Sequence, residues 1–230
     1  MKPKILAIIP ARAGSKRLPK KHIKMLCGKS LIEWTIDQAQ KSKLIDRLVV
    51  NTDDPDVKEI ARRKYVVVYD RKKSLAQDNS SIYDVIFDQL EKENKEYGIE
   101  PCYRCYQWPC KCKEGPLMEK EKGYDIIVLL EPTSPLRKDD DIDRAIQKFL
   151  DSGKDSLVSI GRVNLEAPNC YFPYGLLYVS KIEALKKYKT FYQQKMDFYL
   201  IENWQCYEID NLIDFIKIEA IMKNKLNGKI

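Results

Sequence analysis

The sequence predicts an α/β fold in which helices flank a mostly parallel sheet, and three observations indicate this class. Short apolar runs such as residues 126–130 recur along the 230-residue chain and are typical of buried parallel strands. Segments of helical length, several with capping signals, separate these runs. A composition of 44% hydrophobic and 33% charged residues excludes wholesale disorder. We therefore expect one domain over residues 1–230.

The elements of the first half follow one another as strand and helix. The first strand is expected at residues 4–9, and Ser30 with Glu33 forms a capping-box pattern that begins a helix reaching about residue 42. A strand at 48–51 precedes a helix at 54–64, in which Pro55 takes a permitted early position. The β-branched and aromatic run 65–69 predicts a third strand.

The second half continues the alternation. Helices are expected at 80–94, 140–150, 182–188 and 211–223, and strands at 126–130, 156–160 and 176–180. Strands that alternate with helices form a parallel sheet covered on both faces. In such sheets ligands bind at the carboxyl ends of the strands, where we expect the functional site.

The charge pattern excludes some partners. Lys and Arg number 41 against 34 Asp and Glu, a net charge of +7, but the excess is scattered except between Arg12 and Lys24. That cluster suits a small polyanion better than a nucleic acid duplex. No run approaches the roughly 20 apolar residues that cross a membrane, and Pro10 interrupts the first apolar run too early for a signal peptide. We expect a cytoplasmic protein that binds neither nucleic acid nor membrane.

A basic loop follows the first strand. The backbone can approach a ligand closely at Gly14, and the cations of the loop can neutralise phosphate charge; they are Arg12, Lys16, Arg17 and Lys21. The loop matches neither GxxxxGK[ST] nor GxGxxG. A solvated basic turn is the alternative, but the strand-end position and the embedded apolar Leu18 favour a polyphosphate site.

A cysteine-rich segment at about 98–123 interrupts the strand–helix rhythm and is expected to be an insertion. Four thiolates within eleven residues match the ligand number of structural Zn²⁺; they are Cys102, Cys105, Cys110 and Cys112. Iron–sulfur ligation, a redox role and free cysteines are the alternatives. We favour zinc, because a long irregular segment without a hydrophobic core of its own needs a bound metal ion to stabilise its fold.

Five segments in order resemble the acylneuraminate cytidylyltransferases, also called CMP-sialic acid synthetases. They are residues 9–21 (IPARAGSKRLPKK), 28–32 (GKSLI), 52–54 (TDD), 71–78 (RKKSLAQD) and 129–137 (LLEPTSPLR). The resemblance is dense over residues 4–160 and thinner afterwards. It implies a Rossmann-like, GT-A-like nucleotidyltransferase domain that joins CMP from CTP to an acidic sugar and releases pyrophosphate.

The resemblance also implies roles for individual residues. Arg12, Ser15, Lys16 and Lys21 would contact the CTP phosphates, and Arg71 with the backbone near Ser80 would hold the nucleoside. Charge neutralisation at the α-phosphate makes Arg12, Lys16 and Lys21 the catalytic candidates. The predicted nucleotide site in full is Ala11, Arg12, Gly14, Ser15, Lys16, Arg17, Lys21, Arg71 and Ser80.

The catalytic metal is expected to be Mg²⁺, which prefers oxygen ligands. Residues 207–215 (YEIDNLIDF) resemble the family's DIDxxxDF segment, and Glu208 and Asp210 alternate along a stretch expected to be extended, which would turn both carboxylates the same way. Glu208 stands where the family has Asp.

Three departures concern the acceptor side. Glu131 replaces a glutamine that the family directs at its sugar, and His22 replaces an asparagine beside the nucleotide, as a hydrogen-bonding group rather than a catalytic base. The subdomain through which the family dimerises, normally inserted between Ile160 and Tyr174, is missing, so the oligomeric state, a homodimer included, stays open. Glu131 and Tyr174 are the candidate acceptor-binding residues.

We therefore expect a Mg²⁺-dependent cytidylyltransferase that acts on a sialic-acid-like (nonulosonate) sugar or a related surface-glycan precursor. One alternative keeps the fold but uses another nucleoside triphosphate with a sugar phosphate or a small phosphorylated alcohol. Another is a catalytically weakened nucleotide-binding or docking protein, an idea that rests on Glu131 and the missing subdomain.

Overall fold

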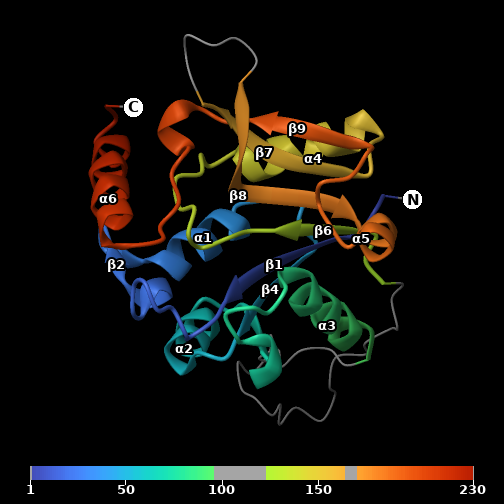
Figure 1. Cartoon of the computed structure of the whole chain (residues 1–230), viewed down its shortest axis with the longest axis horizontal. Coiled ribbons are helices and arrows are strands. Elements are labelled where there is room, and N and C mark those ends of the chain that lie inside the picture. Colours follow the sequence, from blue (N-terminus) through green and yellow to red (C-terminus); the bar gives the residue numbers. More distant parts are fainter. Residues whose placement is uncertain (1, 96–122, 164–169, 230) are drawn as a thin grey trace.

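A single large sheet organises the chain in the computed structural model, which describes residues 2–95, 123–163 and 170–229 (Figure 1). Within these residues the sheet has seven strands in the order β5-β4-β1-β6-β8-β7-β9. In chain order the strands are β1 (Ile5–Ala11), β4 (Arg47–Thr52), β5 (Val67–Asp70), β6 (Ile126–Leu129), β7 (Ser156–Arg162), β8 (Tyr171–Lys181) and β9 (Met196–Leu200). A short hairpin, β2 (Met25–Leu26) and β3 (Lys29–Ser30), lies outside it.

The sheet is mostly parallel, as the sequence predicts. Strands β5, β4, β1 and β6 pair in parallel, and β7 pairs in parallel with β9. Strand β8 is antiparallel to both of its neighbours, β6 and β7, and is the one reversed strand among the described strands of this sheet. No helix within the described ranges is long and apolar enough to cross a membrane.

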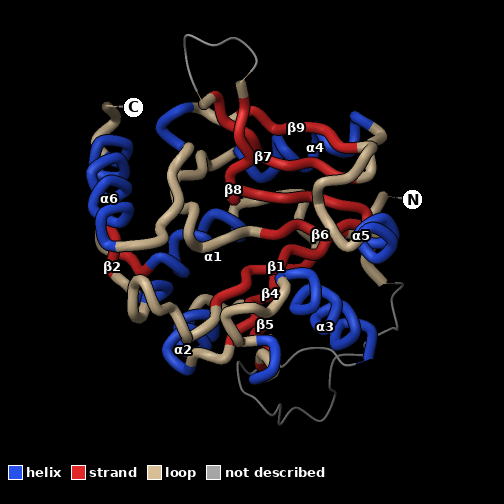
Figure 2. The backbone as a smooth tube through the Cα atoms, in the orientation of Figure 1, coloured by secondary structure: helices blue, strands red, loops and turns tan. Residues whose placement is uncertain are grey.

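Helices cover both faces of the sheet (Figure 2). They are α1 (Leu31–Gln40), α2 (Pro55–Arg63), α3 (Ile82–Lys95), α4 (Asp141–Ser152), α5 (Ile182–Tyr188) and α6 (Leu212–Leu226). Alternate residues of β1 supply the two faces: Ile5 and Ile9 pack in the cluster that includes residues of α1, α2 and α4, whereas Leu6 and Ile8 pack with residues of α3 and α5. The layers are therefore α/β/α.

The helix starts follow from local chemistry. The Ser30 side chain accepts from the Glu33 N–H, and the Glu33 carboxylate accepts from the Ser30 N–H at 2.8 Å, so the predicted capping box is confirmed. Asp54 caps α2 through the Asp56 N–H at 2.9 Å, with Pro55 in the first turn.

Three elements differ from the sequence prediction. The expected strand at 65–69 begins only at Val67, because Tyr65 turns the chain with a φ of 57°. Strand β8 starts at Tyr171, five residues before the expected strand at 176–180, and β9 was not predicted. Both extra pairings involve β7, so they depend on contacts between segments rather than on local periodicity.

The pairing of β7 with β8 is irregular where it approaches the site. Val158 faces Tyr178, but Ile160 faces Pro173, so the register shifts between these pairs. The Ser159 hydroxyl accepts from the Leu177 N–H at 3.1 Å inside the irregular region. Such a bulge bends the strand, and it brings Gly175 of β8 against the segment that follows β6.

Candidate active site

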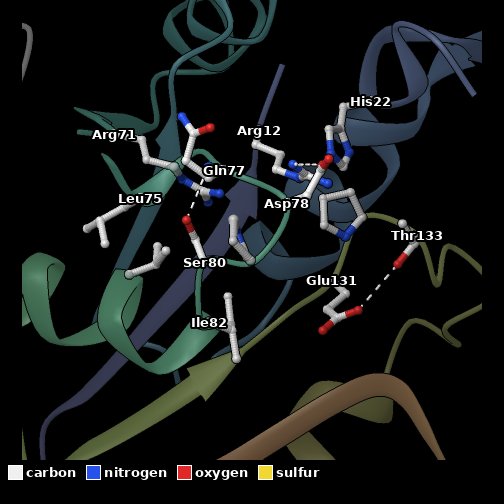
Figure 3. A pocket seen from close by; sticks show the side chains of 13 residues that line it. Arg12, His22, Arg71, Leu75, Gln77, Asp78, Ser80, Ile82, Glu131 and Thr133 are labelled. Atoms are coloured by element: carbon white, nitrogen blue, oxygen red, sulfur yellow. Dashed lines mark hydrogen bonds and ion pairs between the residues drawn. The ribbon is translucent and has the colours of Figure 1, made fainter. Parts of the chain in front are cut away.

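A cavity of about 210 Å³ opens at the carboxyl ends of β1, β5 and β6 (Figure 3). Strand β1 pairs with β4 on one side and with β6 on the other, so this is the point at which the strand order reverses. Crevices at such points bind ligands in open parallel sheets. The lining residues are Pro10, Arg12, His22, Arg71, Leu75, Gln77, Asp78, Ser80, Ile82, Val85, Glu131, Pro132 and Thr133.

The basic loop after β1 lies beside this cavity, and carboxylates hold its cations. Arg12 Nη1 lies 2.7 Å from Asp78 Oδ1, and Lys16 Nζ pairs with the other oxygen of Asp78. The Ala13 N–H donates to Asp53 Oδ1 at 2.9 Å. Leu18 is buried in an apolar cluster with Phe215 and Ile218 of α6, which anchors the far end of the loop.

The remaining cations of the loop face the segment before α6. Arg17 Nη2 lies 3.1 Å from Asp210 Oδ1, and Lys21 Nζ lies 3.8 Å from the same oxygen. Lys21 also donates to the Ile209 carbonyl at 3.0 Å. Burial lowers the pKa of Lys21, and the charge of Asp210 partly opposes this effect.

Hydrogen bonds to the buried residue Asn51 fix the position of the Arg71 guanidinium. Its Nε donates to Asn51 Oδ1 at 2.8 Å and its Nη2 to the Asn51 carbonyl at 3.1 Å, while Asn51 Nδ2 donates to Gln89 Oε1 at 2.9 Å. Burial lowers the pKa of Arg71 to about 10, which leaves the guanidinium charged at neutral pH. One fixed cation therefore lines the cavity on the side of β5.

The turn between β5 and α3 closes one wall. Ser80 Oγ donates to the Ser74 carbonyl at 3.1 Å and accepts from the Gln77 N–H at 3.1 Å. These bonds hold the segment 74–80 in a compact turn that presents Gln77, Asp78 and Ser80 to the cavity.

Two carboxylates meet on the side of β8. A Cβ built on Gly175 would lie 2.9 Å from Glu131 Oε2 and 3.0 Å from Glu208 Oε1, and Glu208 also accepts from the Gly175 N–H. Burial, and next the charge of Glu208, raise the pKa of Glu131 to about 7. A side chain at position 175 would therefore force these two carboxylates to shift.

A fully buried arginine supports this wall. Arg137 Nη2 donates to the Glu131 carbonyl at 2.8 Å, and its Nε donates to the Leu176 carbonyl at 2.7 Å. The guanidinium thus joins the end of β6 to β8, and burial lowers its pKa to about 10. The positions of Glu131 and Gly175 depend on this bridge.

The structure brings together only part of the predicted site. Arg12, Arg71, Ser80 and Glu131 line the cavity. The others do not line it; they are Ala11, Gly14, Ser15, Lys16, Arg17, Lys21 and Tyr174. Lys16 still joins the site through Asp78. Tyr174 packs edge-on against Phe172, with ring centroids 5.7 Å apart.

The predicted metal ligands have separate partners. Glu208 faces Gly175 and Glu131, whereas Asp210 pairs with Arg17 and Lys21. Among the described residues no group of three or more His, Cys, Asp or Glu is placed to hold a metal ion. The four clustered cysteines at 102, 105, 110 and 112 lie outside the described residues.

Sequence reasoning missed the residues that act through distant partners. In the sequence, Asn51 is the polar last residue of a predicted buried strand. Its hydrogen bond with Arg71 depends on how β4 pairs with β5. Gly175 carries no signal beyond being a glycine within an apolar strand, which can indicate a close approach. Asp78 belongs to a quoted motif, but its pairing with Arg12 and Lys16 could not be read from spacing.

The fold and site together define an α/β protein of the nucleotidyltransferase type. A solved CMP-2-keto-3-deoxy-manno-octonic acid synthetase complexed with CTP superposes with a TM-score of 0.69 at 15% identity, covering 96% of this chain and 99% of that one. A 4-diphosphocytidyl-2C-methyl-D-erythritol synthase from Anaerococcus prevotii gives 0.64 at 13% identity, covering 97% and 100%. These likenesses establish the fold.

Residues 6–105 match the model of the cytidylyltransferase family. A CMP-N,N'-diacetyllegionaminic acid synthase of Legionella pneumophila is 28% identical over 96% of this chain and 97% of that protein. An N-acylneuraminate cytidylyltransferase of Streptococcus agalactiae is 27% identical over 95% of this chain but 52% of its own length. A pseudaminic acid cytidylyltransferase of Campylobacter jejuni is 30% identical over 64% and 53%. The chain thus spans nearly all of the first relative and about half of the other two.

Proposed function

We propose that this protein is a CTP-dependent cytidylyltransferase that transfers CMP to a nonulosonate sugar and releases pyrophosphate. The observation that carries the proposal is the cavity at the switch point of the sheet, lined by Arg12 and Arg71 and flanked by the basic loop. The relatives support the choice of substrates, since those reported are named as cytidylyltransferases or CMP-sugar synthases of nonulosonic acids.

The reaction requires little covalent chemistry from the protein. A hydroxyl oxygen of the sugar attacks the α-phosphorus, the new O–P bond forms as the bond to pyrophosphate breaks, and the hydroxyl proton passes to solvent. Catalysis then depends on positioning and on neutralising phosphate charge. Arg12, Lys16 and Lys21 supply that charge, and Arg71 with the turn at Ser80 orients the nucleoside.

Glu131 and Tyr174 are proposed for the acceptor side. Glu131 lines the cavity wall next to β8, on the side away from Arg71 that the acceptor would approach. With a pKa near 7 the carboxyl is partly protonated at neutral pH, which lessens its repulsion of an acidic sugar and lets it donate a hydrogen bond.

We propose Mg²⁺ as the catalytic ion, with Glu208 and Asp210 as protein ligands. Their oxygens fit the ion's preference, and a cation beside Glu208 would relieve its repulsion of Glu131. When bound, the ion would neutralise charge on the transferred phosphate. To bind the ion, Asp210 would have to give up its ion pairs with Arg17 and Lys21.

Structural zinc is a separate proposal for Cys102, Cys105, Cys110 and Cys112, and it rests on their number and spacing. Cys105→Ser should lower the zinc content found by elemental analysis of the purified protein and leave CTP affinity within a few fold. Zinc content equal to that of the parent protein would contradict this ligand set.

The deciding experiment is calorimetric titration with CTP, UTP, GTP and ATP, each with and without Mg²⁺, followed by pyrophosphate release with candidate acceptors. We expect CTP to bind selectively and N-acylneuraminate, legionaminic acid or pseudaminic acid to support turnover. Preference for another base, or turnover with a sugar phosphate, would assign a different nucleotidyltransferase. Absence of binding by all four nucleotides would favour a docking protein.

A further inference from the structure

We propose that a second cavity, beside α1 and α6, binds a small organic phosphate monoester. The proposal goes beyond the proposed function and does not depend on it, because this cavity shares no lining residue with the cavity at the switch point of the sheet. It gives the protein a separate site for a small anion.

The second cavity lies between α1, α6 and the chain that follows β6, elements that Figure 1 labels. Its volume is about 560 Å³, against about 210 Å³ for the cavity at the switch point. Sites for small molecules commonly measure about 300–1,000 Å³. Trp34 comes from α1 and Lys41 from its end, Met222 and Lys225 come from α6, and Lys138 lies just before α4.

The lining carries an excess of positive charge, since four lysines stand against two aspartates, a net charge of +2. Asp37 is engaged by two lysines, Lys29 at 2.5 Å and Lys64 at 2.7 Å. Asp139 pairs with Lys41 at 2.9 Å, and its side chain is 72% exposed. An exposed pair of this kind is weak, so Lys41 can exchange it for a ligand. A dianion would balance the charge of the lining.

Lys225 is a cation with unused hydrogen-bonding capacity. Its ammonium donates to the Arg137 carbonyl and lies 5.6 Å from the centre of the Trp204 ring. It makes no ion pair within the described part of the chain. An ammonium group has three N–H donors, so Lys225 keeps donors for an anion while the Arg137 carbonyl holds it in place.

The charges around Lys225 favour an anion among them. Burial lowers the pKa of Lys225, and the charges of Asp139 and Asp141 partly oppose this effect. The charges of Lys41 and Lys138 lower the pKa further, so the three ammonium groups are close enough to repel one another. A phosphate group among them would relieve this repulsion, and lysine binds phosphate as a point charge.

The apolar part of the lining indicates an organic group on the phosphate. It consists of Trp34, Met222 and Leu226. The Trp34 ring is fixed, because its Nε1 donates to the Leu26 carbonyl at 2.7 Å. Met222 is buried, whereas Leu226 is 54% exposed and would lose contact with water under a ligand. Inorganic phosphate would leave these side chains without a contact.

Calorimetric titration of the full chain with phenyl phosphate tests the site, because this probe joins one phosphate to an apolar ring. We expect binding that Lys225→Met weakens about 10-fold, since a charge-assisted hydrogen bond is lost. Lys223→Met is the matched control: this lysine of α6 pairs with Glu219 at 3.2 Å, lies outside the cavity lining and should not affect affinity. No binding at millimolar probe, or equal affinity of Lys225→Met and the parent protein, would overturn the proposal.

A second variant guards against a loss of folding in Lys225→Met. Lys41 is exposed, so Lys41→Met should fold normally and weaken binding about 3-fold. Inorganic phosphate should bind at least about 3-fold more weakly than phenyl phosphate, because it lacks the apolar ring. Equal affinity for the two probes would refute the ester as ligand. Displacement of phenyl phosphate by equimolar CTP would place the probe in the other cavity and overturn the proposal, whereas a failure of CTP to bind would refute the proposed function alone.

Discussion

Asp78 joins Arg12 to the cavity wall: its Oδ1 lies 2.7 Å from Arg12 Nη1, and its other oxygen pairs with Lys16 Nζ. Both cations are among the residues that the family resemblance assigns to the triphosphate. In the proposed function these cations bind phosphate oxygens, so a bound nucleotide would have to compete with this carboxylate.

Removing this competition should tighten nucleotide binding. We expect Asp78→Asn to lower the Kd for CTP, measured by calorimetry, by up to about 5-fold, the range of an exposed ion pair. Asp139→Asn removes the same charge from a pair with Lys41 outside this cavity and should leave the Kd unchanged. Weaker binding by Asp78→Asn would show that Asp78 orients the cations instead.

Lys16→Ala should lower kcat/KM by about 100-fold or more, because a cation that stabilises charge developing in the transition state is lost. The measurement is pyrophosphate release at saturating acceptor. Lys20→Ala is the matched control: this lysine lies in the same loop but pairs with Asp56 at 3.5 Å. Near-normal turnover of Lys16→Ala would remove the loop from the catalytic assignment.

Arg71→Lys should raise the KM for CTP about 10-fold with little change in kcat. A lysine keeps the charge but cannot reproduce the two bonds that the guanidinium donates to Asn51, so the cation loses its fixed position. Steady-state kinetics at varied CTP concentration measure the effect, and Arg62→Lys at the exposed end of α2 serves as control. An unchanged KM would place Arg71 outside the nucleotide contact.

Glu131→Gln should stabilise the metal-free protein at alkaline pH. The pKa of Glu131 is raised in the folded state to about 7 from an ordinary 4.5, so the folded protein holds this proton more tightly than the unfolded chain does. Stability is therefore lost as pH rises from 4.5 to 7, and the amide escapes that loss. We expect a gain of about 1–3 kcal/mol at pH 8 and almost none at pH 4.5.

Urea unfolding of the two proteins at both pH values measures this difference. Glu202→Gln should show no alkaline gain, because hydrogen bonds from Lys138 and Trp204 lower the pKa of its carboxyl in the folded state. A gain for Glu131→Gln that does not depend on pH would indicate a packing effect rather than a buried charge.

The predictions from sequence held where the signal was local. The Ser30–Glu33 cap, the helix that follows Asp54 and the loop after β1 each lie within a few residues of their signal. Strand β9 was not predicted because Asp197 interrupts a short apolar run. The strand lies at the edge of the sheet, where Phe198 and Leu200 are exposed.

The acceptor side could not be predicted for a different reason. Glu131 and Glu208 are 77 residues apart, and they meet only because β8 pairs with β6 and shifts register against β7. Two carboxylates at such a separation carry no joint pattern in the sequence. Glu208 accepts from the Gly175 N–H, whereas Asp210 faces Arg17 and Lys21, so the two carboxylates do not point the same way.

The placement of the cavity at the switch point has a consequence for cooperativity. Its walls come from the chain after β1, β5 and β6, with Glu131 on one and Arg71 on another, so no single strand and its following loop contain the site. A bound ligand therefore stabilises the parallel half of the sheet as a whole. It adds RT ln(1 + [L]/Kd) to the free energy of unfolding. Bound nucleotide should slow amide hydrogen exchange in these three strands by a common factor, as one unit of opening.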